Sequence, residues 1–171
     1  MNKKIVYPIS IISICVVVVV WWWYCLSVTT LIFVRHADRD GSNDALTEAG
    51  EDRAEALVHV AEKTGATAIY HSGANRTRLT ATPLANALGI AMTEQADAQL
   101  TINDILTYHL GETVIVSGHS DTVPEMIGLA GGPAVPPIDH DEYDNLFVLS
   151  RCNCWFGANN LLKLQYGAVS P

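Results

Sequence analysis

The sequence predicts an α/β domain with three layers, α/β/α, and a mostly parallel central sheet. Two observations predict this fold class. Apolar runs of strand length alternate along the chain with stretches in which apolar residues recur at helical spacing. Three of the apolar runs also end next to histidine or arginine. Because ligands bind beyond the carboxyl ends of parallel strands, these polar residues indicate a site at that edge of the sheet.

The first apolar segment lies at the N-terminus. Residues 5–28 contain no charged residue, and three tryptophans and Tyr24 lie near the end of this segment. Its length suffices to cross a bilayer, and aromatic residues concentrate at membrane interfaces. A cleaved signal peptide and a lipoprotein signal are the alternatives. Trp-Trp-Tyr before Cys25 is too bulky for a lipoprotein cleavage site, and no small-residue cleavage pattern is visible near Ser27. We expect residues 1–28 to be a membrane anchor or signal segment, and residues 29–171 to form the domain.

Charge suggests the orientation of this segment and the partners of the domain. Lys3 and Lys4 precede the segment, so the positive-inside rule predicts a single-pass anchor with the domain on the extracytoplasmic side. Arg35 and Arg39 follow closely and weaken this prediction. The chain has 10 Lys and Arg against 18 Asp and Glu, a net charge of -8. Such a surface repels nucleic acid, so we expect no nucleic-acid partner.

The next elements read as a strand, a loop and a helix. TTLIFV at residues 29–34 is rich in β-branched and apolar residues, as buried strands are, and GSND at residues 41–44 has the composition of a loop. Thr47 can cap the helix that follows, and Gly65 can end it. The apolar stripe of this helix consists of Ala54, Leu57, Val58 and Ala61.

The pattern then repeats. ATAIY at residues 66–70 predicts a second strand, and a helix with an apolar stripe follows and ends before Gly89, with Pro83 either opening or kinking it. The remaining expected elements are a weaker helix at 99–110, a strand at 113–117, a short helix at 123–130, and a strand at 146–150 that could pair with 161–166.

Arginine and histidine residues gather at three of the predicted strand ends. The residues are Arg35 and His36 after the first strand, His71, Ser72 and Arg76 after the second, and His119 after the third. Guanidinium groups match the oxygens of a dianionic phosphate, and a neutral imidazole is a nucleophile near pH 7. The cluster predicts a phosphoryl-transfer pocket. The isolated histidines His59, His109 and His140 are interpreted as ordinary surface or core residues.

Several motifs resemble those of a known family. They are LIFVRHADR, ALTEAGEDRAEAL, IYHSGANRTRLTATPLANALG and VIVSGHSDTVP, in this order, followed by EYDNLFVLS and LQYG. The sequence resembles the histidine phosphatase superfamily, the phosphoglycerate mutase-like group, and specifically its small branch 1 members. The resemblance covers residues 31–167. Ala37 stands where the family has glycine after the Arg-His pair.

The resemblance implies a phosphoglycerate mutase-like fold and a metal-independent phosphatase without a cofactor. His36 would accept the phosphoryl group as a phosphohistidine, Arg35 and Arg76 would hold the phosphate oxygens, and His119 would stabilise the transferring group. Arg39 occupies a place where more distant acid phosphatases carry a further phosphate-binding arginine. The expected substrates are phosphomonoesters, either phosphorylated small molecules or phosphoproteins, because the segment that caps the site in sugar-phosphate mutases is short here.

The sequence does not single out a general acid for the leaving group. Asp121 follows His119 by two residues, and Asp38 follows His36 by two, so both are candidates. Asp104 is a third. An enzyme without a strong acid would favour substrates with good leaving groups, such as phosphohistidine, anhydrides or aryl phosphates.

Three other interpretations of the same residues are possible. A non-catalytic phosphate-binding module tethered to the membrane could use the same pocket without turnover. A serine hydrolase would place its nucleophile at Ser120, but Thr122 stands where the tight turn needs glycine. A metal site could use three histidines of the cluster, His36, His71 and His119, although neighbouring arginines would oppose a cation.

Overall fold

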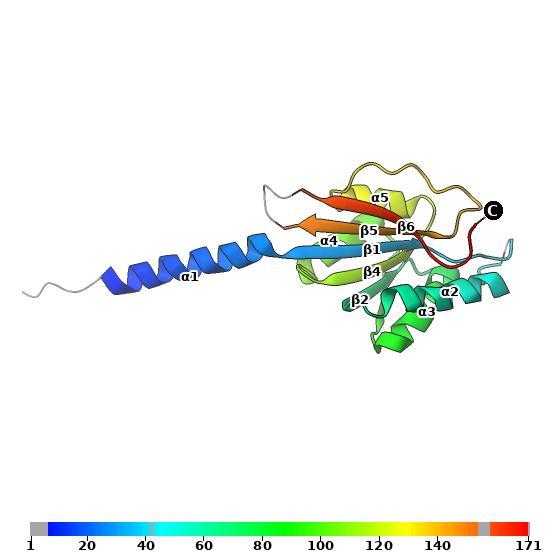
Figure 1. Cartoon of the computed structure of the whole chain (residues 1–171), viewed down its shortest axis with the longest axis horizontal. Helices are drawn as coiled ribbons and strands as arrows, with labels where there is room; N and C mark the ends of the chain where they lie inside the picture. Colours follow the sequence, from blue (N-terminus) through cyan, green and yellow to red (C-terminus); the bar gives the residue numbers. More distant parts are fainter. Residues whose placement is uncertain (1–6, 42, 154–157, 171) are drawn as a thin grey trace, which may run out of the picture.

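The computed structural model describes residues 7–41, 43–153 and 158–170 of the 171-residue chain (Figure 1). Helices and strands alternate through most of it, as the sequence predicts. The helices are α1 (Tyr7–Leu26), α2 (Glu48–Ala61), α3 (Asn75–Leu88), α4 (Ala98–Tyr108) and α5 (Thr122–Leu129). The strands are β1 (Val28–Arg35), β2 (Ala66–His71), β3 (Met92–Glu94), β4 (Thr113–Gly118), β5 (Asn145–Cys152) and β6 (Asn160–Gln165).

The strands form one mostly parallel sheet of six strands in the order β3-β2-β4-β1-β5-β6. β1 and β4 pair in parallel, as do β2 with β4 and β2 with β3. β5 pairs antiparallel with β1, and β6 pairs antiparallel with β5. The predicted pairing of the last two strands is therefore present, and the fold class is confirmed.

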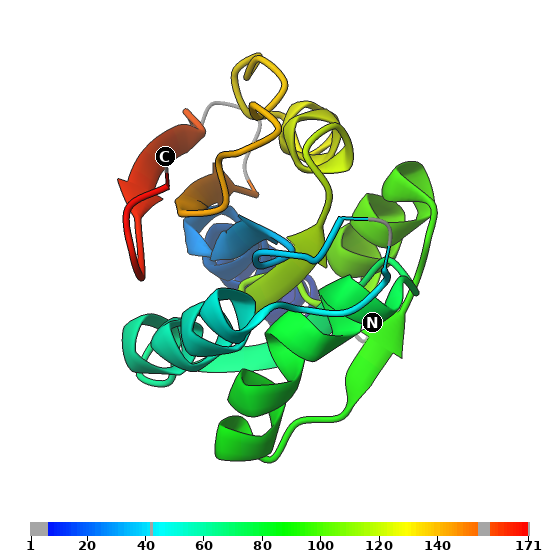
Figure 2. The ribbon, with the colours of Figure 1, turned by 90° about the vertical axis from the view of Figure 1, so that its right-hand side faces the viewer.

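Helices cover both faces of the sheet, which makes the three layers. α2 and α3 lie on one side of it, and α4 and α5 on the other (Figures 1 and 2). β1 contributes to both cores: Ile32 and Val34 pack with α2 and α3, whereas Leu31 and Phe33 pack with α4 and α5. A strand buried on both faces needs apolar residues at successive positions, which explains the unbroken apolar run before Arg35.

The helix boundaries largely follow the expected signals. The Thr47 side chain accepts a hydrogen bond from the Gly50 amide, as an N-cap does. α3 ends at Gly89, whose φ of 68° is in the left-handed region. Pro83 lies inside α3 and does not open it, and α2 ends at Ala61, before the predicted Gly65. β3 was not predicted, because three residues at a sheet edge carry no periodic pattern.

The prediction of a membrane-anchored localisation is wrong for the part of the chain that the structure describes, where no helix is long and apolar enough to cross a bilayer. Residues 1–6 of the predicted anchor lie outside the described residues. The extracytoplasmic placement and the membrane partner depended on this anchor and are withdrawn with it.

Candidate active site

The carboxyl ends of three parallel strands coincide in register. Arg35 at the end of β1 lies opposite Gly118 of β4, and His71 at the end of β2 lies opposite Ser117. A cavity of about 280 Å³ opens beyond these ends. Its lining consists of Arg35, His36, Arg39, Arg76, His119, Ser120, Asp121, Thr122 and His140. The structure thus brings together most of the residues that the sequence predicts for the site.

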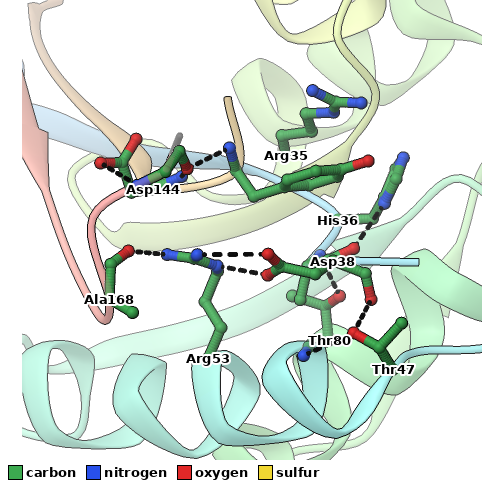
Figure 3. A network of polar contacts seen from close by, with 12 residues as sticks. Arg35, His36, Asp38, Thr47, Arg53, Thr80, Asp144 and Ala168 are labelled. Atoms are coloured by element: carbon green, nitrogen blue, oxygen red, sulfur yellow. Dashed lines mark hydrogen bonds and ion pairs between the residues drawn. The ribbon is translucent and has the colours of Figure 1, made fainter. Parts of the chain in front are cut away.

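His36 is held in one orientation. Its backbone amide donates to the Gly118 carbonyl over 2.9 Å, and the next amide, that of Ala37, donates to Oγ1 of Thr80 over 2.8 Å. In the ring, Nδ1 donates to the Ala37 carbonyl oxygen at 2.8 Å, so Nε2 is left for the cavity (Figure 3). Burial, followed by the charges of Arg35 and Arg76, lowers the pKa of His36 to about 3. The ring is therefore neutral near pH 7, with a lone pair on Nε2.

Ala37 occupies the position of the family's glycine without backbone strain. No non-glycine residue that the structure describes has a positive φ, so Ala37 does not need the left-handed conformation that favours glycine. Its side chain is fully buried beside the site. The departure from the family's motif therefore leaves the path of the chain after His36 intact.

Arg35 is a buried cation clamped by backbone oxygens. Its Nη1 donates to the carbonyl oxygens of Asp139 and Glu142, both at 2.8 Å, and its guanidinium lies 4.1 Å from the ring centroid of Tyr143. Burial lowers the pKa of Arg35, which reflects the cost of taking this charge out of water. The carbonyl dipoles offset part of that cost, and an anion in the cavity would offset more.

Arg76 enters the cavity from the first turn of α3. Its Nη1 lies 2.7 Å from Oδ1 of Asp44, and its Nη2 lies 3.4 Å from Nδ1 of His119. Asp44 thus faces one side of the guanidinium and His119 another. Arg35 and Arg76 place two guanidinium groups on the same cavity, a geometry suited to phosphate oxygens.

A chain of hydrogen bonds fixes the ring of His119. Nδ1 accepts from Arg76, so in the neutral ring Nε2 carries the proton and donates to the Ser72 hydroxyl at 2.8 Å. Ser72 lies 3.1 Å from the Thr77 hydroxyl, which itself donates to the Ala74 carbonyl oxygen. Burial, and then the charge of Arg76, lowers the pKa of His119. The rings of His36 and His119 meet edge to face, with centroids 5.5 Å apart.

Asp38, one of the two main candidates for the general acid, points away from the cavity toward Arg53 (Figure 3). Arg53 Nε lies 2.6 Å from Oδ2 and Nη2 lies 3.4 Å from Oδ1. Arg53 Nη1 also donates to the carbonyl oxygens of Tyr166 and Ala168. Asp38 and Arg53 therefore join the loop after His36, helix α2 and the C-terminal segment, and both carboxylate oxygens of Asp38 are occupied.

The other two candidates for the general acid, Asp121 and Asp104, lie in different parts of the structure. Asp121 lines the cavity, and its Oδ1 accepts from the Thr122 amide at the start of α5. Asp104 lies on α4, outside the cavity lining. His71 is also absent from the lining, and its Nδ1 accepts from the Gly73 amide. Among the described residues no three metal-ligating side chains gather, so the histidine metal site has no support.

Three residues of the site are absent from the sequence prediction: Asp44, Tyr143 and His140. His140 is predicted to be an ordinary histidine, because nothing in a loop sequence shows that the loop folds over a strand end. Tyr143 lies in the EYDN stretch, which resembles the family but carries no predicted role. Ser72 is predicted at the end of the second strand without a role, and in the structure it contacts His119.

Comparison with known families agrees with this geometry. The family model described as histidine phosphatase superfamily (branch 1) matches residues 31–101, which contain Arg35, His36 and Arg76. The resemblance to the histidine phosphatase superfamily is confirmed. Members of this superfamily are phosphatases and mutases. No curated protein sequence matches the chain.

Solved structures share the histidine phosphatase fold. One, from Agrobacterium tumefaciens and proposed to be the phosphohistidine phosphatase SixA, is 21% identical with a TM-score of 0.55, covering 82% of this chain and 97% of its own. A mycobacterial glucosyl-3-phosphoglycerate phosphatase is 16% identical with a TM-score of 0.60, covering 72% and 90%. YhfR of Bacillus stearothermophilus is 19% identical with a TM-score of 0.58, covering 71% and 90%. At these identities the likeness establishes the fold.

Proposed function

We propose that this protein is a phosphatase that hydrolyses phosphomonoesters through a phosphohistidine on His36. The observation that carries the proposal is the state of His36: a neutral ring with Nδ1 bonded to the Ala37 carbonyl and Nε2 left for a cavity that also holds two arginines. A nucleophile for phosphorus needs a lone pair, and the charge that builds on the phosphoryl oxygens needs cations nearby.

In the first step, Nε2 of His36 attacks phosphorus and the bond from phosphorus to the leaving oxygen breaks. Arg35 and Arg76 hold the equatorial oxygens, and His119 adds a third donor when its Nε2–H turns from Ser72 toward the phosphoryl group. Arg35 cannot follow the substrate, because two backbone carbonyls clamp it. A cation that is already in position spends no energy on reorganisation during the reaction.

Asp121 is the better placed of the two main candidates for the general acid. It lines the cavity, whereas both oxygens of Asp38 accept hydrogen bonds from Arg53. Among the described residues, the Thr122 amide bonds to Oδ1 of Asp121 and none bonds to Oδ2, so Oδ2 can carry the proton for the leaving group. In the second step the same carboxylate takes a proton from the water that attacks phosphohistidine, which releases phosphate and restores neutral His36.

The substrate class follows from the place of Asp121. This residue is exposed at the cavity mouth, in contact with water. A carboxyl group that no packing holds against the leaving oxygen transfers a proton to a poor leaving group inefficiently, so we expect phosphohistidine, anhydrides and aryl phosphates to react faster than alkyl phosphates. The name of the SixA-type neighbour, a phosphohistidine phosphatase, is consistent with this substrate class.

The test is phosphate release from p-nitrophenyl phosphate by the full chain, with and without a chelator, beside His36→Ala. We expect activity that survives the chelator and falls at least a thousandfold in the variant, as expected when a covalent nucleophile is removed. Quenching during turnover with alkaline detergent should trap a phosphoprotein in the wild type only, and later acid treatment should release its phosphate. Phosphate binding without turnover in the folded wild type would contradict the proposal and favour a phosphate-binding module.

A further inference from the structure

Arg39 differs from the other arginines of the cavity in its lack of a polar partner among the described residues. Arg39 lines the cavity, yet its side chain makes no hydrogen bond or ion pair with any residue that the structure describes. Its backbone is fixed, because Arg39 forms an antiparallel bridge with Leu46. The guanidinium therefore emerges from a defined position and carries five unused donors.

The five other arginines of the chain all have polar partners among the described residues. Arg53 and Arg76 are paired with carboxylates, Arg35 with two carbonyl oxygens, and Arg78 and Arg151 with asparagine side chains. An unpaired arginine is unexpected in a chain of net charge -8, where carboxylates are plentiful. Its place on the lining of an anion-binding cavity indicates that a ligand supplies the missing partner.

The cavity is also larger than one phosphate requires. About 10–15 Å³ of cavity space holds one water-sized group, so the four oxygens of a phosphate need roughly 40–60 Å³. The cavity has about 280 Å³. His140 lines it together with Arg39, and it projects from the loop whose carbonyl groups clamp Arg35. The space that a phosphate leaves is therefore bordered by two further groups that can donate hydrogen bonds to an anion.

We propose that Arg39 and His140 form a second anion subsite next to the transferred phosphoryl group. The preferred substrates then carry another anionic group, a phosphate or a carboxylate, close to the scissile bond. The inference about substrates rests on the proposed function, whereas the subsite can be tested by binding alone. Among the described residues that line the cavity, Asp121 is the one carboxylate, and it limits the subsite to the side of the cavity away from α5.

A pair of non-hydrolysable probes tests the subsite without turnover. Methylphosphonate offers one anionic group, and methylenediphosphonate offers two. Calorimetric titration of the full chain should show at least tenfold tighter binding of methylenediphosphonate, which corresponds to about 1.4 kcal/mol. Arg39→Gln should reduce this preference below threefold, and His140→Gln should reduce it measurably. Arg78→Gln removes the same charge from an exposed arginine of α3 outside the cavity lining, and it should keep the preference.

Three outcomes would overturn the inference. Equal binding of the two probes by the wild type would show that no second subsite exists. A parallel loss of both probes in Arg39→Gln would place Arg39 on the transferred group itself. A loss of preference in Arg78→Gln would show that the general field of the protein favours the more highly charged probe. If the preference behaves as expected but p-nitrophenyl phosphate is not hydrolysed, the proposed function fails and the subsite stands.

Discussion

The carboxylate of Asp44 bonds to both the side chain and the backbone of Arg76. Oδ1 lies 2.7 Å from the guanidinium Nη1, and the same carboxylate accepts the backbone amides of Asn75 and Arg76 at the start of α3. The N-cap residue of α3, Ala74, has no side chain that could do this. The amide of Asn75, and then Arg76, lowers the pKa of Asp44. A loop residue thus caps the helix and aims its arginine at the cavity.

We expect Asp44→Ala to raise KM for an aryl phosphate on the order of tenfold, since Arg76 loses the charge-assisted bond that orients it. The value of kcat should change less, because Asp44 does not touch the reacting atoms. Asp44→Asn keeps a capping oxygen, so its KM should lie between those of the wild type and Asp44→Ala. Steady-state kinetics measures both constants, and a fall in kcat at unchanged KM would contradict a positioning role.

Asp121→Asn tests the general acid through the leaving group. Phenyl phosphate needs a proton on its leaving oxygen, whereas p-nitrophenolate leaves readily without one. General acid catalysis contributes typically 10²-fold or more, so we expect about a hundredfold loss with phenyl phosphate and less than about tenfold with p-nitrophenyl phosphate. Asp141→Asn, an exposed carboxylate outside the cavity lining, is the control. Equal losses with both substrates would assign the proton to another group.

Gly50 allows α2 to approach the loop after His36. A Cβ at this position would overlap the carbonyl oxygen of Asp38, which already accepts the Thr47 amide. We expect Gly50→Ala to lower the free energy of unfolding by about 1–3 kcal/mol, the usual cost of overpacking. Gly128→Ala in α5, where a Cβ would meet open space, should raise it by about 0.5–1 kcal/mol. Urea denaturation measures both, and a neutral Gly50→Ala would refute the close contact.

The free energy of unfolding should decrease as the pH falls below about 6.5, at pH values where the carboxylates are still ionised. Burial lowers the pKa of His36, His71 and His119 in the folded chain. Below pH 6.5 the unfolded chain therefore binds more protons than the folded one, and stability decreases as the pH falls. Each histidine can contribute up to about 1.4 kcal/mol per pH unit.

Denaturation curves between pH 7 and pH 4.5 measure this slope. His36→Asn should make it shallower, because the variant removes the group whose pKa is lowered to about 3. His59→Asn replaces a histidine on the exposed side of α2 and should leave the slope unchanged. An unchanged slope in His36→Asn would contradict the burial of a neutral ring.

The sequence was informative where apolar patterns fix the path of the chain. The strands that end at Arg35, His71 and Gly118 are apolar runs, and parallel pairing brings their carboxyl ends to one edge. This is sufficient to gather Arg35, His36 and His119 around one cavity. Arg76 joins them because α3 starts directly after β2. The fold class and the centre of the candidate site were therefore predictable.

The remaining features depend on loops, and loops have no periodicity. Asp44 and His140 reach the cavity along irregular paths that no residue pattern announces. The case of Asp38 is different, because its partner could have been noticed. Arg53 lies within the apolar stripe of α2, next to Ala54, and a charged residue at a buried helical position requires a partner. Spacing from His36 alone suggested an acid where the structure has an ion pair.

The clamp on Arg35 consists of main-chain oxygens of Asp139 and Glu142 rather than of their side chains. Mutations can therefore exchange the side chains of residues 139–142 without releasing the arginine. His140 belongs to this stretch. Substitutions in this loop could therefore change the rim of the cavity while Arg35 keeps its position. In this fold, substitutions in one loop can therefore change substrate specificity among related proteins without changing the residues proposed for the chemistry.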